Sequence, residues 1–376
     1  SDLAGGPVTD NRPRYPERQS PMRILIDLQH PAHLHFFRHA AKRLRDEGHT
    51  VKFTGRDKDI LVQLADELGI EVEVFGVCRK GLFHMGTELI QRQWRLQKII
   101  RTYKPDVMMA IAGTYIASLG WLFRIPTYVF YDTEHATLSN LISYPFATCV
   151  YVPQAYCKKI RWRHECYNGY HELAYLHPDY FTPDPSVLDE LGIQQGETFT
   201  IVRFVGWGAV HDRGKAGFSR KDKIRAVQAL AQHGRVLVSA EGEFPIELEG
   251  FRLNLPVGRV HDLMAYASLV FGESPTMASE AAILGVPAVY INPLPLGYSL
   301  EQERDYGLVT NFNDQCPDIP RAVEKARNIL SGQDGVDSQA RRKDLLDEKI
   351  DVTEFLHTVA LQRPYANASR HPAAQK

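Results

Sequence analysis

The chain is patterned as short apolar runs that alternate with amphipathic stretches. Runs such as residues 23–28 and 106–111 have the length of a buried strand, and the stretches between such runs repeat apolar side chains at helical spacing. Strands that alternate with helices are typical of a parallel, doubly wound sheet. In the first half we expect strands at 23–28, 50–54, 71–75, 106–111, 127–131 and 148–153.

An irregular segment separates this series from a second one. Residues 167–185 contain prolines and lack a sustained period, as expected for a crossover between domains. Beyond it we expect strands at 199–205, 235–239, 252–254, 268–271 and 288–291. We divide the chain into a flexible N-terminal extension (1–21), a first α/β domain (22–165), a crossover linker (166–198), a second α/β domain (199–342), a C-terminal helix (343–365) and a flexible tail (366–376).

One strand–turn–helix–strand segment in the second domain carries an unusual acid. Ser274 and Pro275 are a good N-cap and first helical residue, and Gly285 ends the helix before the next strand. Glu280 lies too deep in this helix to act as a first-turn acid, and it shares a face with Thr276. A carboxylate there can accept both hydroxyl hydrogens of a ribose, while the helix start faces a diphosphate. The alternative is a surface helix with a solvated glutamate.

From Gly272 to Pro287 the segment reads G-x-x-x-T-x-x-x-E-A-A-x-x-G-x-P. It resembles the nucleotide-binding segment of GT-B fold glycosyltransferases and of the related UDP-GlcNAc 2-epimerases. Further motifs look like a prokaryotic family related to these enzymes: His-Pro-Ala-His-x-His-Phe-Phe (30–37), Asp-x-Glu-His-Ala (132–136), Tyr-x-Gly-x-x-Glu-x-x-Tyr-Leu (167–176) and Gly-Glu-Ser-x-Thr-Met (272–277).

The resemblance implies the GT-B plan for residues 22–361, namely two Rossmann-like, doubly wound parallel-sheet domains that face each other across a cleft. The first domain would bind the acceptor, the second would bind the nucleotide-sugar, and the terminal helix would pack back on the first. In that superfamily the residue matched by Glu280 binds the ribose of a UDP-sugar.

Composition excludes several other classes. A net charge of −1 argues against bulk electrostatic binding of nucleic acid, and five cysteines without a C-x-x-C pair argue against a disulfide framework or a structural zinc site. We expect reduced thiols and a cytoplasmic protein. The G-x-G-x-x-G fingerprint is missing after the first strand, so we expect no nicotinamide or flavin cofactor. Residues 107–123 are uncharged, but their glycines and polar residues favour a strand, turn and helix over a membrane span.

Two loops at expected strand ends hold candidate catalytic groups. His30 and His33 follow the first strand, where many GT-B transferases place a histidine as base or acceptor-site group; a local helix-capping role is the alternative. We prefer His33. Asp132 and Glu134 follow the strand at 127–131, and either is a candidate general base. Comparable 2-epimerases carry an acid within E-A-G, whereas this chain reads Glu134-His-Ala. We expect no metal.

The nucleotide-sugar is expected to contact loops at the strand ends of the second domain. A glycine-rich loop after the strand at 199–205 carries cations suited to a diphosphate. The resemblance adds a base-reading segment near 260 and an acid–glutamine pair near 301. The predicted contacts are Arg203, His211, Lys215, Glu241, Val260, His261, Ser274, Thr276, Met277, Glu280, Glu301 and Gln302.

These features predict a glycosyltransferase that moves a sugar from a nucleotide-sugar, UDP-linked by resemblance, to a glycan- or lipid-linked acceptor in polysaccharide or glycoconjugate synthesis. The alternatives are a UDP-GlcNAc 2-epimerase-like isomerase and a nucleotide-sugar sensor without turnover. Leu82, Phe83 and the basic helix near 92–104 suggest peripheral contact with the inner face of a membrane, or else form an ordinary solvated face. The oligomeric state is left open.

Overall fold

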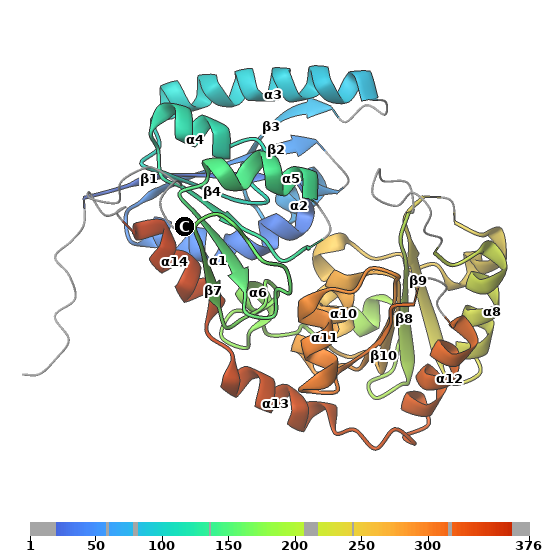
Figure 1. The fold of residues 1–376 in the computed structure, drawn as a ribbon. Coiled ribbons are helices and arrows are strands. Elements are labelled where there is room, and N and C mark those ends of the chain that lie inside the picture. The colour runs from blue at the N-terminus through green and yellow to red at the C-terminus, as the bar shows by residue number, and fades with distance from the viewer. Residues whose placement is uncertain are drawn as a thin grey trace, which may run out of the picture.

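Two parallel β-sheets, each covered by helices on both faces, form the protein (Figure 1). The computed structural model describes residues 20–57, 60–77, 82–134, 137–206, 217–242, 244–314 and 318–362. The predicted fold class, two doubly wound parallel-sheet domains, is confirmed.

The first sheet has seven strands in the order β3-β2-β1-β4-β5-β6-β7. Its central strands are almost wholly buried because helices cover both faces, which explains their continuous apolar runs. The strands are β1 (Arg23–Leu28), β2 (Thr50–Asp57), β3 (Val72–Val77), β4 (Val107–Ile111), β5 (Thr127–Phe130), β6 (Cys149–Pro153) and β7 (His164–Tyr167). The helices are α1 (Pro31–Asp46), α2 (Leu61–Glu67), α3 (Leu82–Tyr103), α4 (Ala117–Phe123), α5 (Thr137–Ser143) and the 3-10 turn η1 (Tyr144–Phe146).

The second sheet has five strands in the order β12-β11-β10-β8-β9. Alternate residues of β11 enter different cores, since Tyr290 packs on the α10 side and Val289 on the side of α8 and α12. The strands are β8 (Phe199–Phe204), β9 (Arg235–Ala240), β10 (Leu269–Gly272), β11 (Ala288–Ile291) and β12 (Val309–Phe312). The helices are α8 (Arg220–Leu230), α9 (Val260–Met264), α10 (Pro275–Leu284), α11 (Gly297–Arg304) and α12 (Ile319–Leu330), with 3-10 turns η3 (Ile246–Phe251) and η4 (Val257–Arg259).

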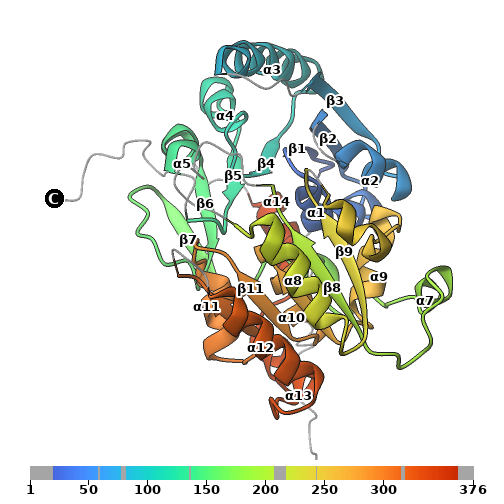
Figure 2. The same ribbon diagram turned by 90° about the vertical axis from the view of Figure 1, so that its right-hand side faces the viewer.

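The chain crosses between the domains twice. The first crossing carries α6 (Leu173–Leu176) and α7 (Ser186–Glu190). The second follows α12 through α13 (Ser338–Glu348), which contacts α10, to α14 (Val352–Leu361), which lies against α1 and α6 (Figures 1 and 2). Both crossings therefore meet beside α6.

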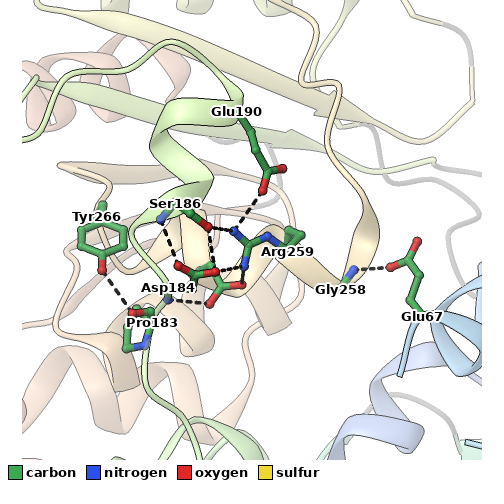
Figure 3. Close-up of polar contacts among 9 residues, drawn as sticks. Glu67, Pro183, Asp184, Ser186, Glu190, Gly258, Arg259 and Tyr266 are labelled. Atoms are coloured by element: carbon green, nitrogen blue, oxygen red, sulfur yellow. Dashed lines mark hydrogen bonds and ion pairs between the residues drawn. The ribbon is translucent and has the colours of Figure 1, made fainter. Parts of the chain in front are cut away.

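An arginine in the second domain anchors the far end of the first crossing. Arg259 pairs with Asp184 at 2.8 Å, with Glu190 at 3.0 Å and with Asp262 at 2.9 Å (Figure 3). In the same view the backbone N–H of Gly258 donates to Glu67 Oε2 of the first domain at 2.7 Å. The crossover is thus fixed to the second domain at α7, and η4 contacts α2 across the junction.

The sequence-based strands are found in the structure with three differences. The expected strand at 252–254 is a single bridge between Val238 and Arg252, and β7 and β12 were not predicted. The basic helix is present, but Arg92 points inward: it is buried and pairs with Asp27 at 2.7 Å. No described helix combines the length and apolar character needed to span a membrane. Residues 1–19 and 363–376 lie outside the described residues.

Gly272, the last residue of β10, has to be glycine. Its φ is +145°, and a Cβ there would meet the carbonyl oxygen of Arg203 at 2.0 Å. We predict that Gly272→Ala lowers the free energy of unfolding by about 3 kcal/mol or more, because strain and overlap add. The matched control is Gly307→Ala, since Gly307 has φ +63° but nothing within 4 Å of its Cβ position, and about 1 kcal/mol is expected there. Equal losses for the two variants in urea titrations would contradict this reading.

Candidate functional site

The carboxyl ends of the two sheets meet at the domain junction, around residues 168–177, which we call the crossover segment. Glu134, after β5, accepts the backbone N–H of Gly297 at the start of α11 at 3.1 Å. Four polar residues of the crossover segment contact the loop after β5 or the helices α10 and α11: Tyr170, His171, Glu172 and Tyr175. The candidate site therefore consists of two sets of strand-end loops and the segment between them.

Asp132 and His171 form a buried acid–histidine pair. His171 Nδ1 lies 3.1 Å from Asp132 Oδ2, and the Thr133 hydroxyl donates to Asp132 Oδ1 at 2.9 Å. Burial alone would raise the pKa of Asp132, but the charge and hydrogen bond of His171 outweigh it and the pKa is lowered. Burial likewise opposes the charged form of His171, yet Asp132 raises the pKa of this imidazole above its usual value. His171 Nε2 has no hydrogen-bond partner among the described residues.

The hydrogen bonds of three histidines distinguish their tautomers. Nδ1 of His30 accepts the N–H of Ala32 at 3.2 Å, and Nδ1 of His33 accepts the N–H of Gln29 at 3.3 Å. When neutral, both rings then carry their proton on Nε2 and are donors there. His171 is the opposite case: its Nδ1 faces a carboxylate, so when the ring is neutral its Nε2 holds the lone pair. His171 thus has the tautomer of a general base, and His33, which acts electrostatically on Asp132, has that of a donor.

Glu172, the next residue, is a carboxylic acid held protonated. It is 3 % exposed, and burial, followed by the negative charge of Asp132, raises its pKa to about 8. The Ser279 hydroxyl donates to Glu172 Oε2 at 2.9 Å, and Gln302 Nε2 donates to that hydroxyl at 2.8 Å. Neighbouring acids with pKa values displaced in opposite directions are the usual mark of an acid–base site.

Glu280 lies on α10 at the same junction and is not a solvated surface acid. It is 6 % exposed, and its Oε1 accepts from Tyr175 at 2.8 Å and lies 2.9 Å from His261 Nε2. The His35 ring stacks on Tyr175, with centroids 5.1 Å apart, and meets His261 edge-on at 4.8 Å. Burial lowers the pKa of His35 well below 6.5 and raises that of Tyr175, so the tyrosine remains a donor. A ribose at Glu280 has to use Oε2 or replace the Tyr175 hydroxyl.

The glycine-rich loop is fastened at both ends beside the start of α10. Glu273, fully buried, accepts the N–H of Val205 at 3.1 Å and the N–H of Phe218 at 2.9 Å. Ser274 caps α10 by accepting from the N–H of Met277, and Thr276 and Met277 are half-buried. The two ends of the loop and the helix start therefore lie together, as an anion site formed by both would require. The predicted phosphate ligands His211 and Lys215 fall outside the described residues.

Other predicted contacts are engaged within the protein. Arg203 donates to Ser239 at 2.7 Å and pairs with Glu241, so a phosphate has to compete with that acid. Glu301 accepts from Tyr170 at 2.6 Å and pairs with Lys349 at 3.3 Å, while Gln302 is buried behind Ser279. Val260 is half-buried at the first residue of α9. The structure thus brings Asp132, Glu134 and Glu280 to one junction and places Arg203 and Glu241 at the ends of β8 and β9.

His171, Glu172 and Tyr175 are the site residues that the sequence analysis did not assign. They stand in the motif Tyr-x-Gly-x-x-Glu-x-x-Tyr-Leu of residues 167–176, and the adjacent His and Glu directly before an apolar run were the signal. No cluster of three His, Cys, Asp or Glu residues suited to a metal ion occurs in the described part of the chain. Metal independence stays a prediction.

Comparison with known proteins places the chain in a family. The profile described as "Protein of unknown function (DUF354)" matches residues 22–216, more than half of the chain. The chain belongs to this family. It is also 24 % identical over 352 residues to "Uncharacterized protein MJ0665" of Methanocaldococcus jannaschii, covering 87 % of this chain and 97 % of that protein.

Solved structures show the fold of this DUF354 chain. It is similar to the UDP-GlcNAc 2-epimerase of Neisseria meningitidis bound to UDP-GlcNAc, with a TM-score of 0.65, 10 % identity and coverage of 91 % and 100 %. The S. aureus MnaA–UDP structure matches with a TM-score of 0.64, 10 % identity and coverage of 89 % and 95 %. The spinosyn forosaminyltransferase SpnP matches with a TM-score of 0.59, 13 % identity and coverage of 91 % and 100 %. The GT-B fold implied by the resemblance is confirmed.

The raised pKa of Glu172 has a consequence for stability. The folded DUF354 chain keeps this proton until about pH 8, whereas the unfolded chain releases it near the ordinary value of 4.5. Between these pH values the folded state binds more protons, so this group makes the free energy of unfolding fall as pH rises. We predict that Glu172→Gln removes this loss, and that the stability of the variant relative to wild type grows from about pH 5 to about pH 9.

Chemical denaturation at several pH values measures this difference, with the exposed Glu71→Gln as control. A difference between Glu172→Gln and wild type that stays constant over the range would show that Glu172 titrates normally.

Proposed function

We propose that this protein is a glycosyltransferase that moves a sugar from a UDP-linked donor to a hydroxyl of a glycan- or lipid-linked acceptor. The observation that carries the proposal is the pairing of two groups at one junction. One is the Asp132–His171 pair after β5, and the other is Glu280 on α10, the helix whose start lies beside the two ends of the glycine-rich loop. The crossover segment contacts both.

The donor belongs to the second domain. Glu280 accepts from the ribose hydroxyls, and Val260 or His261 lies beside the base. The diphosphate binds at the N-terminus of α10, where Ser274 is the N-cap and Pro275 the first helical residue. Glu273 holds the two ends of the glycine-rich loop nearby. Arg203 supplies positive charge once a phosphate displaces Glu241. The proposal needs no metal, because helix start and loop cations take the developing charge.

The acceptor belongs to the first domain. Its hydroxyl gives its proton to His171 Nε2, and its oxygen attacks the anomeric carbon. The bond from that carbon to the diphosphate breaks, and the electron pair leaves with UDP. Asp132 keeps His171 in the reactive tautomer and stabilises the imidazolium that forms. His33 donates from Nε2 to an oxygen of either substrate.

A second candidate is a 2-epimerase acting on a UDP-sugar. The observation that favours it is the contrast between Asp132, whose pKa is lowered, and Glu172, whose pKa is raised to about 8. Such a pair can take a proton from C2 of a sugar on one side and protonate a leaving oxygen on the other. Epimerases are also among the structures that share this fold, one of them solved with UDP-GlcNAc. The departure from E-A-G at Glu134-His-Ala weakens this candidate.

One assay separates these candidates. The purified chain is incubated in D₂O with UDP-GlcNAc and other UDP-sugars, with and without glycans or lipid-linked sugars as acceptors, and UDP and deuterium at C2 are measured. The transferase predicts UDP release that depends on the acceptor. Deuterium at C2 without acceptor supports the epimerase, and binding without either product supports a sensor.

In that assay His171→Gln is expected to lower kcat by about a hundredfold or more with little change in KM, because a general base acts on the chemical step. The control is His164→Gln, an exposed histidine on β7. An unchanged kcat for His171→Gln would remove His171 from the mechanism.

A further inference from the structure

Five large apolar side chains lie exposed together on the outer side of the first domain. They come from α4, α5 and η1, which contact one another beneath α3 (Figure 1). The rings of Trp121 and Phe146 meet with centroids 5.7 Å apart. The side chains are 37–63 % exposed and are Trp121, Leu122, Leu141, Ile142 and Phe146. We call them the apolar patch. Contiguous apolar groups of this kind mark an interaction surface.

Positive charges border the apolar patch on two sides. On the side of α3, exposed Arg101 lies over the Phe123 ring at 5.7 Å and exposed Arg124 follows the end of α4. On the other side is the loop between β6 and β7. It carries exposed Lys159 and Arg161, and its Trp162 ring lies 6.1 Å from Tyr144 of η1. The rim of the patch is therefore basic.

The segments that build this surface are almost free of acids. From Gln91 to Tyr131 the one acid is Asp106, which bonds to Arg23 at the amino end of the sheet. From residue 136 to His164 there is none. A partner that matches both features has to be apolar and negatively charged. A second copy of the chain does not fit, because the rim would face its own like charges without acids to pair with.

We propose that the apolar patch docks the protein onto an anionic phospholipid surface, with Trp121 and Leu141 entering the interface and the rim cations facing lipid phosphates. This differs from the surface expected from the sequence, since Arg92 of the basic helix is buried and the side chains of Leu82 and Phe83 are not among those described. α5 follows Asp132 and Glu134 directly, so docking here brings the junction close to the bilayer. That placement rests on the proposed function and suits a lipid-linked acceptor; docking itself does not depend on the reaction.

Vesicle flotation with the full chain tests the proposal. Vesicles of phosphatidylcholine alone are compared with vesicles containing phosphatidylglycerol. Wild type is expected to float with the anionic vesicles, and Trp121→Ser/Leu141→Ser to lose at least about tenfold in partition. The matched control is Trp94→Ser. Trp94 is equally exposed on α3 but faces β3, where it lines a cavity with Lys52 and Glu73, and this variant is expected to float like wild type.

A charge variant gives a second, independent readout. Arg124→Glu/Lys159→Glu keeps the apolar patch and is expected to lose about tenfold in partition to anionic vesicles, with a loss that shrinks as salt is raised. The proposal is overturned if wild type floats with neither vesicle, if the Trp121/Leu141 variant floats as well as the Trp94 variant, or if size-exclusion chromatography shows a dimer that Trp121→Ser/Leu141→Ser dissociates.

Discussion

The structure depends on three buried polar residues of the crossover segment, which lies at the junction of the two domains. His171 holds Asp132 of the first domain, Glu172 accepts from Ser279 of the second, and Tyr175 donates to Glu280. Buried polar groups are costly unless they are paired, so these contacts fix the junction to one arrangement and leave few alternatives. α14 follows the second crossing and packs against α6. Its Thr353 hydroxyl donates to the carbonyl oxygen of Ala174 at 2.8 Å, which adds a further hydrogen bond to the crossover segment.

The same burial gives the site its chemistry. Three ionisable groups lie within hydrogen-bonding distance or in adjacent positions, and desolvation prevents all of them from being charged at once. Asp132 takes the negative charge because His171 is beside it, and Glu172 keeps its proton because burial, and after it the charge of Asp132, raises its pKa. The loop after β5 and the crossover segment thus bring together an ionised acid, the histidine beside it and a protonated acid, namely Asp132, His171 and Glu172.

Much of the fold could be read from the sequence, and the site only in part. Alternating apolar runs located most strands because a parallel sheet buries both faces; β7, with three of its four residues exposed, lacks that pattern. Ser274, Pro275 and Gly285 indicated the two ends of α10, since caps and first helical positions favour those residues. His171 and Tyr175 were not assigned roles, because their partners Asp132 and Glu280 are distant in sequence. Likewise the motif around Glu301 predicts a sugar ligand. In the structure, however, the Glu301 carboxylate accepts from the Tyr170 hydroxyl and pairs with Lys349.

The central claim is that Glu280 receives a nucleotide ribose at this junction. Isothermal titration with UDP tests it most directly on wild type, Glu280→Gln, Tyr175→Phe and, as control, the exposed Glu324→Gln. Glu280→Gln is predicted to bind UDP about tenfold more weakly or worse, because charged hydrogen bonds are lost. Tyr175→Phe is predicted to bind more tightly, because it removes a hydroxyl that competes with the ribose for Oε1 of Glu280. Wild-type affinity in Glu280→Gln, with the control also unchanged, would contradict the account.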